Sequence, residues 1–444
     1  MNTLQVRYST LRDGFTLFGV LFYFQVLSFF LGVGNVANLD DVAKDVEGNV
    51  INQVCGLITL LVPLFLFFRH KVFLSKTFYR GNLFFLAFVL CVAVSISWSE
   101  DPMLSVKRFI AMLSVIFFAG FIAYNYPVEK IAFMLGCIIG SAALMGLIFA
   151  ALRPDIAFIS GGIRDGAFKG IFAEKNAGAR INAIGVLLLL PMIRQRNPLA
   201  MAYAFFSLIA IALAQSATAI ALIVSGAASY WYFLTLVRLR VNRSLSAFFG
   251  ATLVYALICG FLYANYTLLL DLLGRDSSLT DRTLIWDLLT PFIDERFLKG
   301  YGFGAFWASD DADDFIKRWG YIGNAHSGYL ETLLNGGLIQ LIALLLLFTE
   351  ALLKQYRAIT SEQSAQVRAC ALVIIGLFII TNYVAYVIPN YRSAEFLVFC
   401  TLALSFRHHH ARRPELSPAI RLRRPAARTF TADSVKAYPK EKHS

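Results

Sequence analysis

The sequence predicts an all-α, polytopic integral membrane protein with about twelve transmembrane helices. Of its 444 residues, 58% are hydrophobic and only 15% are charged, whereas soluble domains carry about 25% charged residues. Apolar runs long enough to cross a bilayer core of roughly 30 Å recur along the chain. This composition excludes disordered, collagen-like and coiled-coil proteins. The net charge of +12 does not indicate nucleic-acid binding, because ten of the 40 Lys and Arg lie in the last 38 residues.

Twelve apolar runs are the candidate spans. They are residues 15–34, 50–68, 83–98, 109–124, 131–152, 179–193, 199–215, 217–237, 246–266, 329–348, 369–388 and 394–406. The division between Gln215 and Ala219 requires a very tight turn, and one long broken helix is the alternative there. That alternative would reverse the orientation of every later segment.

The distribution of basic residues favours twelve spans with both termini in the cytoplasm. In this topology 25 of the 40 Lys and Arg lie inside. Every short basic connection also falls there, as the positive-inside rule requires. Eleven spans would place the basic cluster Arg238 to Arg243 outside. We therefore expect one transmembrane domain over residues 1–406 and a basic, disordered cytoplasmic tail over 407–444.

Two outer segments, residues 153–176 and 267–328, are longer than simple connections. From Thr280 to Asp294 apolar residues recur at helical spacing, which predicts an amphipathic helix. We expect this helix to lie on the outer membrane surface; a lid that closes the helix bundle, with Arg282 in solvent, is the alternative. The stretch GYGFGAF, residues 300–306, is not a nucleotide loop because no strand precedes it. We expect flexible backbone near a substrate there.

His326 is the candidate catalytic residue, since it is the one histidine of six on the predicted outer side. It lies in NAHSGYLE at the start of the tenth span, where Asn324 or Ser327 can cap the helix. Unpaired backbone N–H groups at such a helix start can receive an anion. A neutral imidazole can remove the proton of an attacking hydroxyl group. An interfacial histidine that only satisfies a cap is the alternative.

Basic residues at the outer edge of the sixth span are candidate substrate-binding residues. Arg180 follows Lys175 and Asn176 in GIFAEKNAGARINA, at or just below the outer interface. A charge there costs a few kcal/mol unless it is paired or holds a ligand. Snorkelling to the lipid head groups is the alternative. Trp286 is a candidate surface for stacking a sugar ring, and Tyr329 is a further candidate substrate-binding residue.

Five segments occur in an order that resembles a known family. They are SWSEDPMLSVKR, GIFAEKNAGAR, RDSSLTDRTLIW, GYGFGAFW and NAHSGYLETLLNGG, which together span about residues 95 to 340. They are similar to the O-antigen ligase and Wzy-type polymerase superfamily of membrane glycosyltransferases, and within it to the ExoQ-like exopolysaccharide production proteins. Two positions depart from the family pattern. Asp281 stands where Gly is usual, and Ser327 stands where Asn is frequent.

The resemblance implies a metal-independent glycosyltransferase, without a cofactor, whose active site faces the periplasm from the bacterial inner membrane. The donor would be an oligosaccharide on undecaprenyl diphosphate, and the acceptor a saccharide that is itself lipid-linked. Membrane lipids, a flippase and chain-length regulator proteins are the further expected partners; nucleic acid is not. His326 would act as base, and Arg282 with Arg180 would neutralise the leaving diphosphate. Asp281 could pair with Arg282 and weaken that contact.

Polymerisation of repeat units into an exopolysaccharide or O-antigen is the favoured activity. A ligase that transfers finished glycan to lipid A core or protein is the first alternative. A secondary transporter would also have twelve spans, but the spans carry few mid-membrane charges and no paired broken helices. All six cysteines fall in apolar spans, so neither a disulfide nor a metal site is expected.

Overall fold

The predicted all-α fold class is confirmed. In the described part of the computed structural model every regular element is a helix, apart from one isolated bridge between Phe158 and Phe168. The structure describes residues 2–30, 50–160, 165–242, 250, 253, 255, 280–319, 323–359 and 365–404, all within the unit Met1–Phe406. The predicted tail and most of the predicted ninth span lie outside these residues.

Seven described helices are long and apolar enough to cross a membrane. They are α4 (Val50–Arg69), α7 (Pro102–Asn125), α8 (Val128–Leu152), α10 (Lys175–Arg194), α12 (Ala217–Asn242), α17 (Gly328–Ile359) and α18 (Ala365–Val384). Shorter apolar segments are α6 (Leu83–Ser95) with η2 (Ile96–Trp98), α11 (Pro198–Ala214) and α19 (Ala394–Ala403). Each overlaps one predicted span, and the total of twelve stays a prediction.

The first predicted span is placed differently. In place of one helix over residues 15–34, α1 (Asn2–Tyr23) begins earlier and ends where Gln25 adopts φ 62°, before the short α2 (Val26–Phe30). The helix includes Arg12 and Asp13, which form an ion pair of 2.8 Å. The hydroxyl of Tyr126 also donates to Asp13, at 2.6 Å. Two charged residues that precede the apolar run are therefore paired within the protein.

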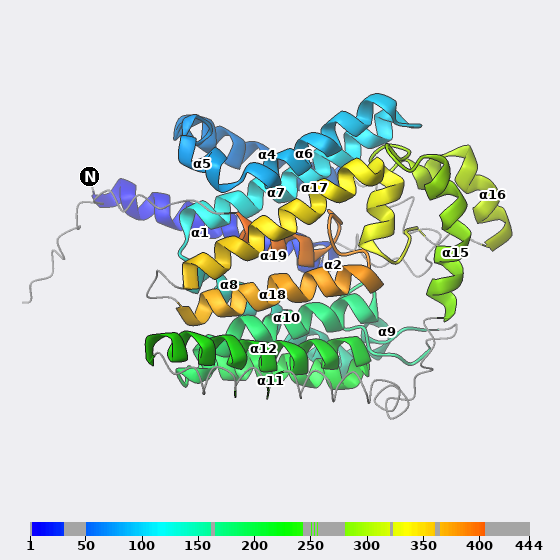
Figure 1. Ribbon diagram of the computed structural model, residues 1–444. Coiled ribbons are helices and arrows are strands. Elements are labelled where there is room, and N and C mark those ends of the chain that lie inside the picture. Colours follow the sequence, from blue (N-terminus) through cyan, green and yellow to red (C-terminus); the bar gives the residue numbers. More distant parts are fainter. Residues whose placement is uncertain are drawn as a thin grey trace, which may run out of the picture. The chain divides into compact units, whose positions relative to one another are not determined.

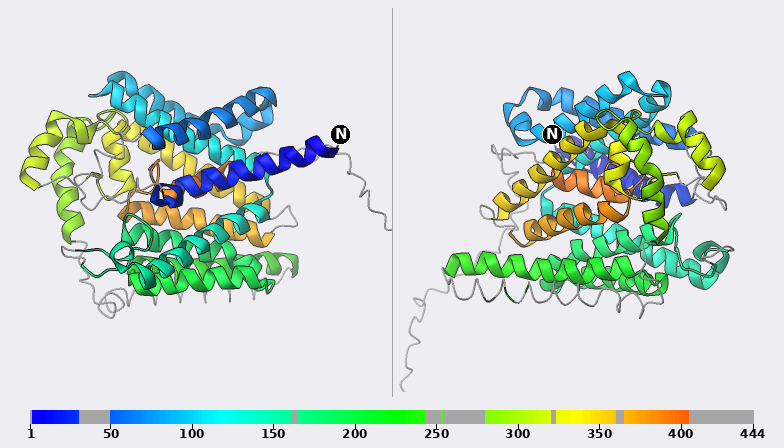
Figure 2. Two further views of the ribbon diagram at one scale, coloured as in Figure 1. Left: turned by 180° about the vertical axis from the view of Figure 1, so that it is seen from behind. Right: turned by 45° about the vertical axis from the view of Figure 1, so that its right-hand side comes forward.

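The tight turn predicted near Gln215 is confirmed. α11 ends at Ala214, Gln215 adopts a left-handed φ of 47°, and α12 begins at Ala217. Both helices pack along α10, and Figures 1 and 2 show them on the same side of the helices. The chain therefore reverses direction here, which excludes a single broken helix.

α18 joins two groups of helices. On one side α10 packs against α8, α11 and α12; on the other, α17 packs against α6, and α7 packs against α4 and α19. α18 contacts α10, α12 and α17. In Figure 1, α15 (Thr280–Glu295) and α16 (Asp310–Trp319) lie at one end of these helices. The connections contain η1 (Val72–Leu74), α5 (Lys76–Gly81), α9 (Pro154–Ala157) and η3 (Phe306–Ala308).

The predicted amphipathic helix is present as α15, but the protein itself covers its apolar face. Leu289 and Ile293 are buried in an apolar cluster that includes Trp307 and Leu334. Only the first apolar position, Leu284, is largely exposed, at 49%. The buried part of the apolar face therefore packs on the protein, and Arg282, which the lid alternative leaves in solvent, donates to the carbonyl of Val384.

The glycine-rich stretch 300–306 is buried, which corrects the expected flexible backbone. The N–H groups of Tyr301 and Gly302 donate to the carbonyls of Leu334 and Asn335 at 2.7 and 2.9 Å. The N–H of Gly304 donates to Asn335 Oδ1 at 2.7 Å. Gly302 and Gly304 have φ values of 96° and 71°, which side chains other than hydrogen disfavour. A Cβ at Gly302 would collide with Ser99 and one at Gly304 with Arg108, so the glycines permit this buried conformation.

Candidate functional site at one end of the helices

His326 lies in a strained turn directly before α17. Its φ of 48° is left-handed, which costs a non-glycine residue roughly 1–2 kcal/mol. The N–H of His326 donates to Asn324 Oδ1 at 2.9 Å, while Ser327 Oγ accepts from Leu330 N at 3.5 Å. Of the two predicted caps, Ser327 therefore caps α17 weakly, and Asn324 stabilises the turn that carries the histidine.

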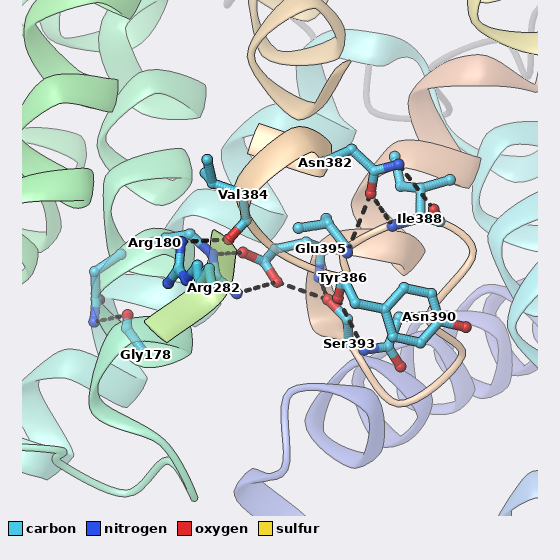
Figure 3. Close-up of polar contacts among 12 residues, drawn as sticks. Gly178, Arg180, Arg282, Asn382, Val384, Tyr386, Ile388, Asn390, Ser393 and Glu395 are labelled. Atoms are coloured by element: carbon cyan, nitrogen blue, oxygen red, sulfur yellow. Dashed lines mark hydrogen bonds and ion pairs between the residues drawn. The ribbon is translucent and has the colours of Figure 1, made fainter. Parts of the chain in front are cut away.

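The start of α17 contacts the segment that follows α18. The N–H of Gly328 donates to the carbonyl of Ala385 at 3.2 Å. A Cβ on Gly328 would lie 2.1 Å from Asn382 Oδ1, so only glycine fits. That Oδ1 also accepts from the N–H groups of Val387 and Ile388 at 3.2 and 2.8 Å (Figure 3). Asn382 therefore fixes Val387 and Ile388 just after the residue that Gly328 contacts.

Arg282 reaches the same segment from α15. Its Nη1 donates to the carbonyl oxygen of Val384 at 2.5 Å (Figure 3). Val384 is the neighbour of Ala385, whose carbonyl accepts from Gly328. Two bonds to adjacent carbonyls therefore bring the predicted arginine close to the turn that carries His326.

Arg180 forms a buried ion pair with Glu395. Its Nε and Nη2 lie 2.8 and 3.4 Å from the two carboxylate oxygens. The side chains are only 12% and 5% exposed. Ser393 Oγ donates to the same carboxylate at 2.7 Å, and Figure 3 shows Arg180 and Arg282 both directed to the polypeptide around this carboxylate. The protein satisfies the guanidinium, so snorkelling to head groups does not explain it.

Lys175 and Asn176 lie in the first turn of α10, one turn before Arg180. Both are half-buried. Residues four apart share a helix face, so Asn176 lies on the Arg180 side. Its Oδ1 is buried without a hydrogen-bond partner, and a buried acceptor of this kind needs one. The amide oxygen of Asn176 therefore stays a candidate acceptor on the Arg180 side of α10.

The two predicted aromatic substrate residues bind backbone carbonyls. Trp286 Nε1 donates to Ala325 O at 3.0 Å, and its ring packs edge-on against Tyr383 with centroids 5.2 Å apart. The hydroxyl of Tyr329 donates to Ile379 O at 2.7 Å. Both side chains therefore connect elements of the site, and their contact with a sugar stays a prediction.

Glu331 is a buried carboxylate below the histidine turn, only 3% exposed. It accepts from the N–H of Ala325 at 2.9 Å and from Trp307 Nε1 at 3.2 Å to each oxygen. The positive charge of Arg108 acts on it as well. Arg108 itself donates to the carbonyl of Gly304. This cluster links the glycine-rich stretch to the turn that carries His326.

Tyr386, which sequence reasoning missed, lies next to this cluster. Burial and the nearby charge of Glu331 raise the pKa of Tyr386 well above its ordinary value. The hydroxyl therefore stays protonated, and it donates to Pro389 O at 3.2 Å. Arg108 and Arg392 act on Tyr386 in the opposite direction. The segment 385–395 thus adds polar groups to a site that the predicted residues only partly outlined.

Arginines from three distant parts of the chain converge here. Arg108, Arg180 and Arg282 come from α7, α10 and α15. Arg180 binds Glu395, Arg282 binds the Val384 carbonyl, and the charge of Arg108 acts on Glu331. Preorganised cations of this kind stabilise an anion that gains charge during a reaction. Within the described ranges, no three His, Cys, Asp or Glu side chains lie close enough to hold a metal ion.

Known proteins resemble this chain, and one match covers part of the candidate site. Residues 202–347, which include Arg282 and His326, match the family described as O-antigen ligase. The chain is also 26% identical over 326 residues to the exopolysaccharide production protein ExoQ of Rhizobium meliloti (strain 1021), an alignment that covers 68% of this chain and 71% of ExoQ. The predicted resemblance to the O-antigen ligase and ExoQ-like superfamily is thereby confirmed.

Proposed function

We propose that this relative of O-antigen ligases and ExoQ is a glycosyltransferase that polymerises lipid-linked oligosaccharide repeat units at the periplasmic face of the bacterial inner membrane. The donor is an oligosaccharide on undecaprenyl diphosphate, and the acceptor is a hydroxyl group of a second, lipid-linked saccharide. The bond between sugar and diphosphate is already activated, so the transfer needs no nucleotide. A donor anchored in lipid also accounts for a site at the end of membrane-spanning helices.

One observation carries the proposal. Arg282 and Gly328 bind the adjacent carbonyls of Val384 and Ala385, and His326 is two residues before Gly328. These two bonds support a site in which an arginine suited to a leaving diphosphate is close to the turn that carries His326, whose imidazole is suited to remove a proton. Base catalysis and charge neutralisation are the two contributions that this transfer needs.

In the proposed reaction, His326 takes the proton of the acceptor hydroxyl while that oxygen bonds to the anomeric carbon of the donor sugar. The bond from this carbon to the diphosphate oxygen breaks, and the diphosphate leaves with the electron pair on its carrier lipid. Arg282 and Arg180 neutralise the charge that develops. Because Arg180 already contacts Glu395, the diphosphate would share its guanidinium with that carboxylate.

Four predicted residues complete the proposed substrate contacts. Lys175 and Asn176 would bind donor groups beside Arg180, where the unpartnered Oδ1 of Asn176 supports a hydroxyl contact. The rings of Trp286 and Tyr329 would border the saccharide. The side chain of Asp281 lies outside the described part of the chain.

A ligase is the second candidate, because the family matched over residues 202–347 is described as O-antigen ligase. Such an enzyme would use the same donor and the same leaving group. Only the acceptor would differ, being lipid A core or a protein. The contacts of Arg282 and His326 described above serve both reactions.

A deletion strain separates the candidates. A polymerase predicts loss of long polymer with single repeat units retained, whereas a ligase predicts accumulation of long lipid-linked glycan. A transporter predicts lipid-linked units that remain inaccessible to reagents added at the outer face. Complementation with wild type and with His326→Ala, at equal protein level, tests the enzyme directly. Normal polymer from His326→Ala would contradict the proposed chemistry.

A further inference from the structure

The peptide groups on both sides of Ala325 are held by side chains. Its N–H donates to Glu331 Oε2 at 2.9 Å, and its carbonyl accepts from Trp286 Nε1 at 3.0 Å. Ala325 itself is fully buried. We call Glu331, Trp286 and the Ala325 backbone the Ala325 clamp. The carbonyl that Trp286 binds belongs to the peptide bond that joins Ala325 to His326.

The Glu331 side of the clamp is itself fixed. Trp307 Nε1 lies 3.2 Å from both carboxylate oxygens, and the residue is only 3% exposed. A buried carboxylate depends strongly on such donors. Its two protein donors, Trp307 and Ala325, therefore determine where it can lie. These contacts suit a positioning group better than a base that must bind a substrate hydroxyl.

The Trp286 side of the clamp connects His326 to α15. Trp286 is four residues after Arg282, so both side chains lie on one face of the helix. Arg282 donates to Val384 O, while the Trp286 ring packs against Tyr383, the residue before Val384. One face of α15 therefore contacts both the segment that binds Arg282 and the turn that carries His326.

We infer that Glu331 and Trp286 are positioning residues that hold His326 in its left-handed turn and fix its place relative to Arg282. A non-glycine residue keeps such a conformation only where the surrounding structure imposes it. Small displacements of a catalytic group can lower a rate by about 100-fold. The inference rests on the proposed function, since it assumes that His326 acts on a substrate.

Trp286→Phe tests the clamp with little other change, because the ring against Tyr383 is kept and only the indole N–H is lost. Trp98→Phe is the matched control, since Trp98 Nε1 also donates to a backbone carbonyl, that of Lys299, at 2.8 Å. The assay uses purified protein and the lipid fraction extracted from the deletion strain. We expect kcat to fall about 10- to 100-fold in Trp286→Phe. The donor KM should change less than about threefold, because the contact of Arg282 with Val384 is kept.

Hydrogen exchange gives a readout that does not depend on activity. The N–H of Ala325 is buried and bonded to Glu331, so exchange in residues 323–328 should be slow in the wild type. Trp286→Phe should accelerate it, and Trp98→Phe should not. A merely structural role would instead lower the yield and melting temperature while leaving kcat of the folded fraction unchanged.

Glu331→Gln tests the other side of the clamp at nearly constant volume. The new amide NH2 would face an N–H donor, either that of Trp307 or that of Ala325, so kcat should fall. Adding Trp307→Phe removes one opposing donor and should restore part of kcat. If the double variant recovers part of kcat, Glu331 acts through the geometry of its hydrogen bonds. If Glu331→Gln alone leaves kcat unchanged, so that there is no loss to rescue, the inference is contradicted.

The remaining outcomes separate the inference from the proposed function. If wild type is active and Trp286→Phe has the same kcat as Trp98→Phe, the clamp does not position the base, while the proposed function stands. If Trp286→Phe accelerates hydrogen exchange in residues 323–328 but leaves kcat unchanged, the inference is also contradicted, and the proposed function still stands. A wild-type protein that is inactive on the extracted lipid would contradict the proposed function itself.

Discussion

Arg180 and Glu395 form an ion pair with Nε 2.8 Å from Oε1, although 215 residues separate them in the chain. The pair joins the start of α10 to the start of α19, and both side chains are largely buried. Ser393 donates to the carboxylate and also caps α19 through the N–H of Glu395. The pair thus connects α10 and α19, which are far apart in the sequence, at the candidate site.

Removing one partner of this pair should destabilise the protein. Glu395→Leu leaves a largely buried guanidinium uncompensated, which costs on the order of 3 kcal/mol. The double variant Arg180→Met with Glu395→Leu should recover most of this loss, because neither charge remains. Unfolding of the purified protein in detergent measures both. As a control, Asp155→Ala removes the Arg153–Asp155 pair, which is 62% exposed at each side chain, and should leave stability unchanged. An equal effect of Glu395→Leu and Asp155→Ala would show that burial of the first pair is energetically unimportant.

Arg282→Lys should impair transfer almost as strongly as Arg282→Ala. An ammonium group cannot reproduce the planar fork that contacts a phosphate and the Val384 carbonyl together. The loss should be about 2–4 kcal/mol of transition-state stabilisation, or roughly 10²- to 10³-fold in rate. Polymer formed per unit of protein in the complemented deletion strain measures it. Arg153→Lys is the control, because Arg153 forms an exposed ion pair with Asp155. Near-normal polymer from Arg282→Ala would remove this residue from the mechanism.

The helical elements could be predicted because their signals are local. Long apolar runs mark α10, α11 and α12, and basic residues on one side favour a turn at Gln215. For the glycine-rich stretch 300–306 the sequence predicts the wrong conformation, because glycines considered alone indicate a flexible backbone. Its fixed conformation depends on Leu334 and Asn335, about 30 residues away, which bind its backbone. No local pattern reveals such a partner.

The same limit applies to the candidate site. Arg180 could be found because a charge at the edge of an apolar run needs a partner or a ligand. Glu395 is also a charge at the edge of an apolar run, but the sequence does not reveal that Arg180 and Glu395 form an ion pair. The contact of Trp286 with Ala325 likewise depends on how α15 folds back. Candidate groups were therefore predictable, while their pairing required the structure.

His326→Gly and His326→Ala should both abolish transfer, but they should differ in stability. Glycine adopts the φ of 48° freely, whereas alanine keeps the cost of a left-handed residue, so the glycine variant should be more stable by about 1 kcal/mol. Melting temperature and polymer length measure the two effects. Donor binding should survive in both variants, because the arginines that hold the diphosphate lie elsewhere. Loss of donor binding together with activity would make His326 a binding residue and direct the search for a base to Asp276, Asp281 and Glu331.

The connection after α12 should lie in the cytoplasm together with both termini. This follows from the positive-inside rule and the basic cluster Arg238 to Arg243, and the reversal at Gln215 fixes the direction of α12 relative to α11. Reporter fusions at Arg240 and within residues 153–176 should therefore give opposite signals. A periplasmic signal at Arg240 would overturn the topology and move His326 to the inner side.

Gly337→Ala should destabilise the protein more than Gly166→Ala, although both glycines have left-handed φ values, 62° and 71°. A Cβ at Gly166 meets nothing within 4 Å, so its cost is the backbone strain of roughly 1–2 kcal/mol. A Cβ at Gly337 would lie 2.2 Å from the backbone carbon of Leu298, and overpacking adds about 1–3 kcal/mol. The backbone around Leu298 cannot yield easily, because the N–H of Leu338 donates to Phe297 O at 2.8 Å. Melting temperatures of the two variants in the same detergent give the comparison. Gly336 and Gly337 have non-helical backbone angles and kink α17 at this point. Equal losses would mean that the contact between Leu298 and this kink opens without cost and does not hold the glycine-rich stretch in place.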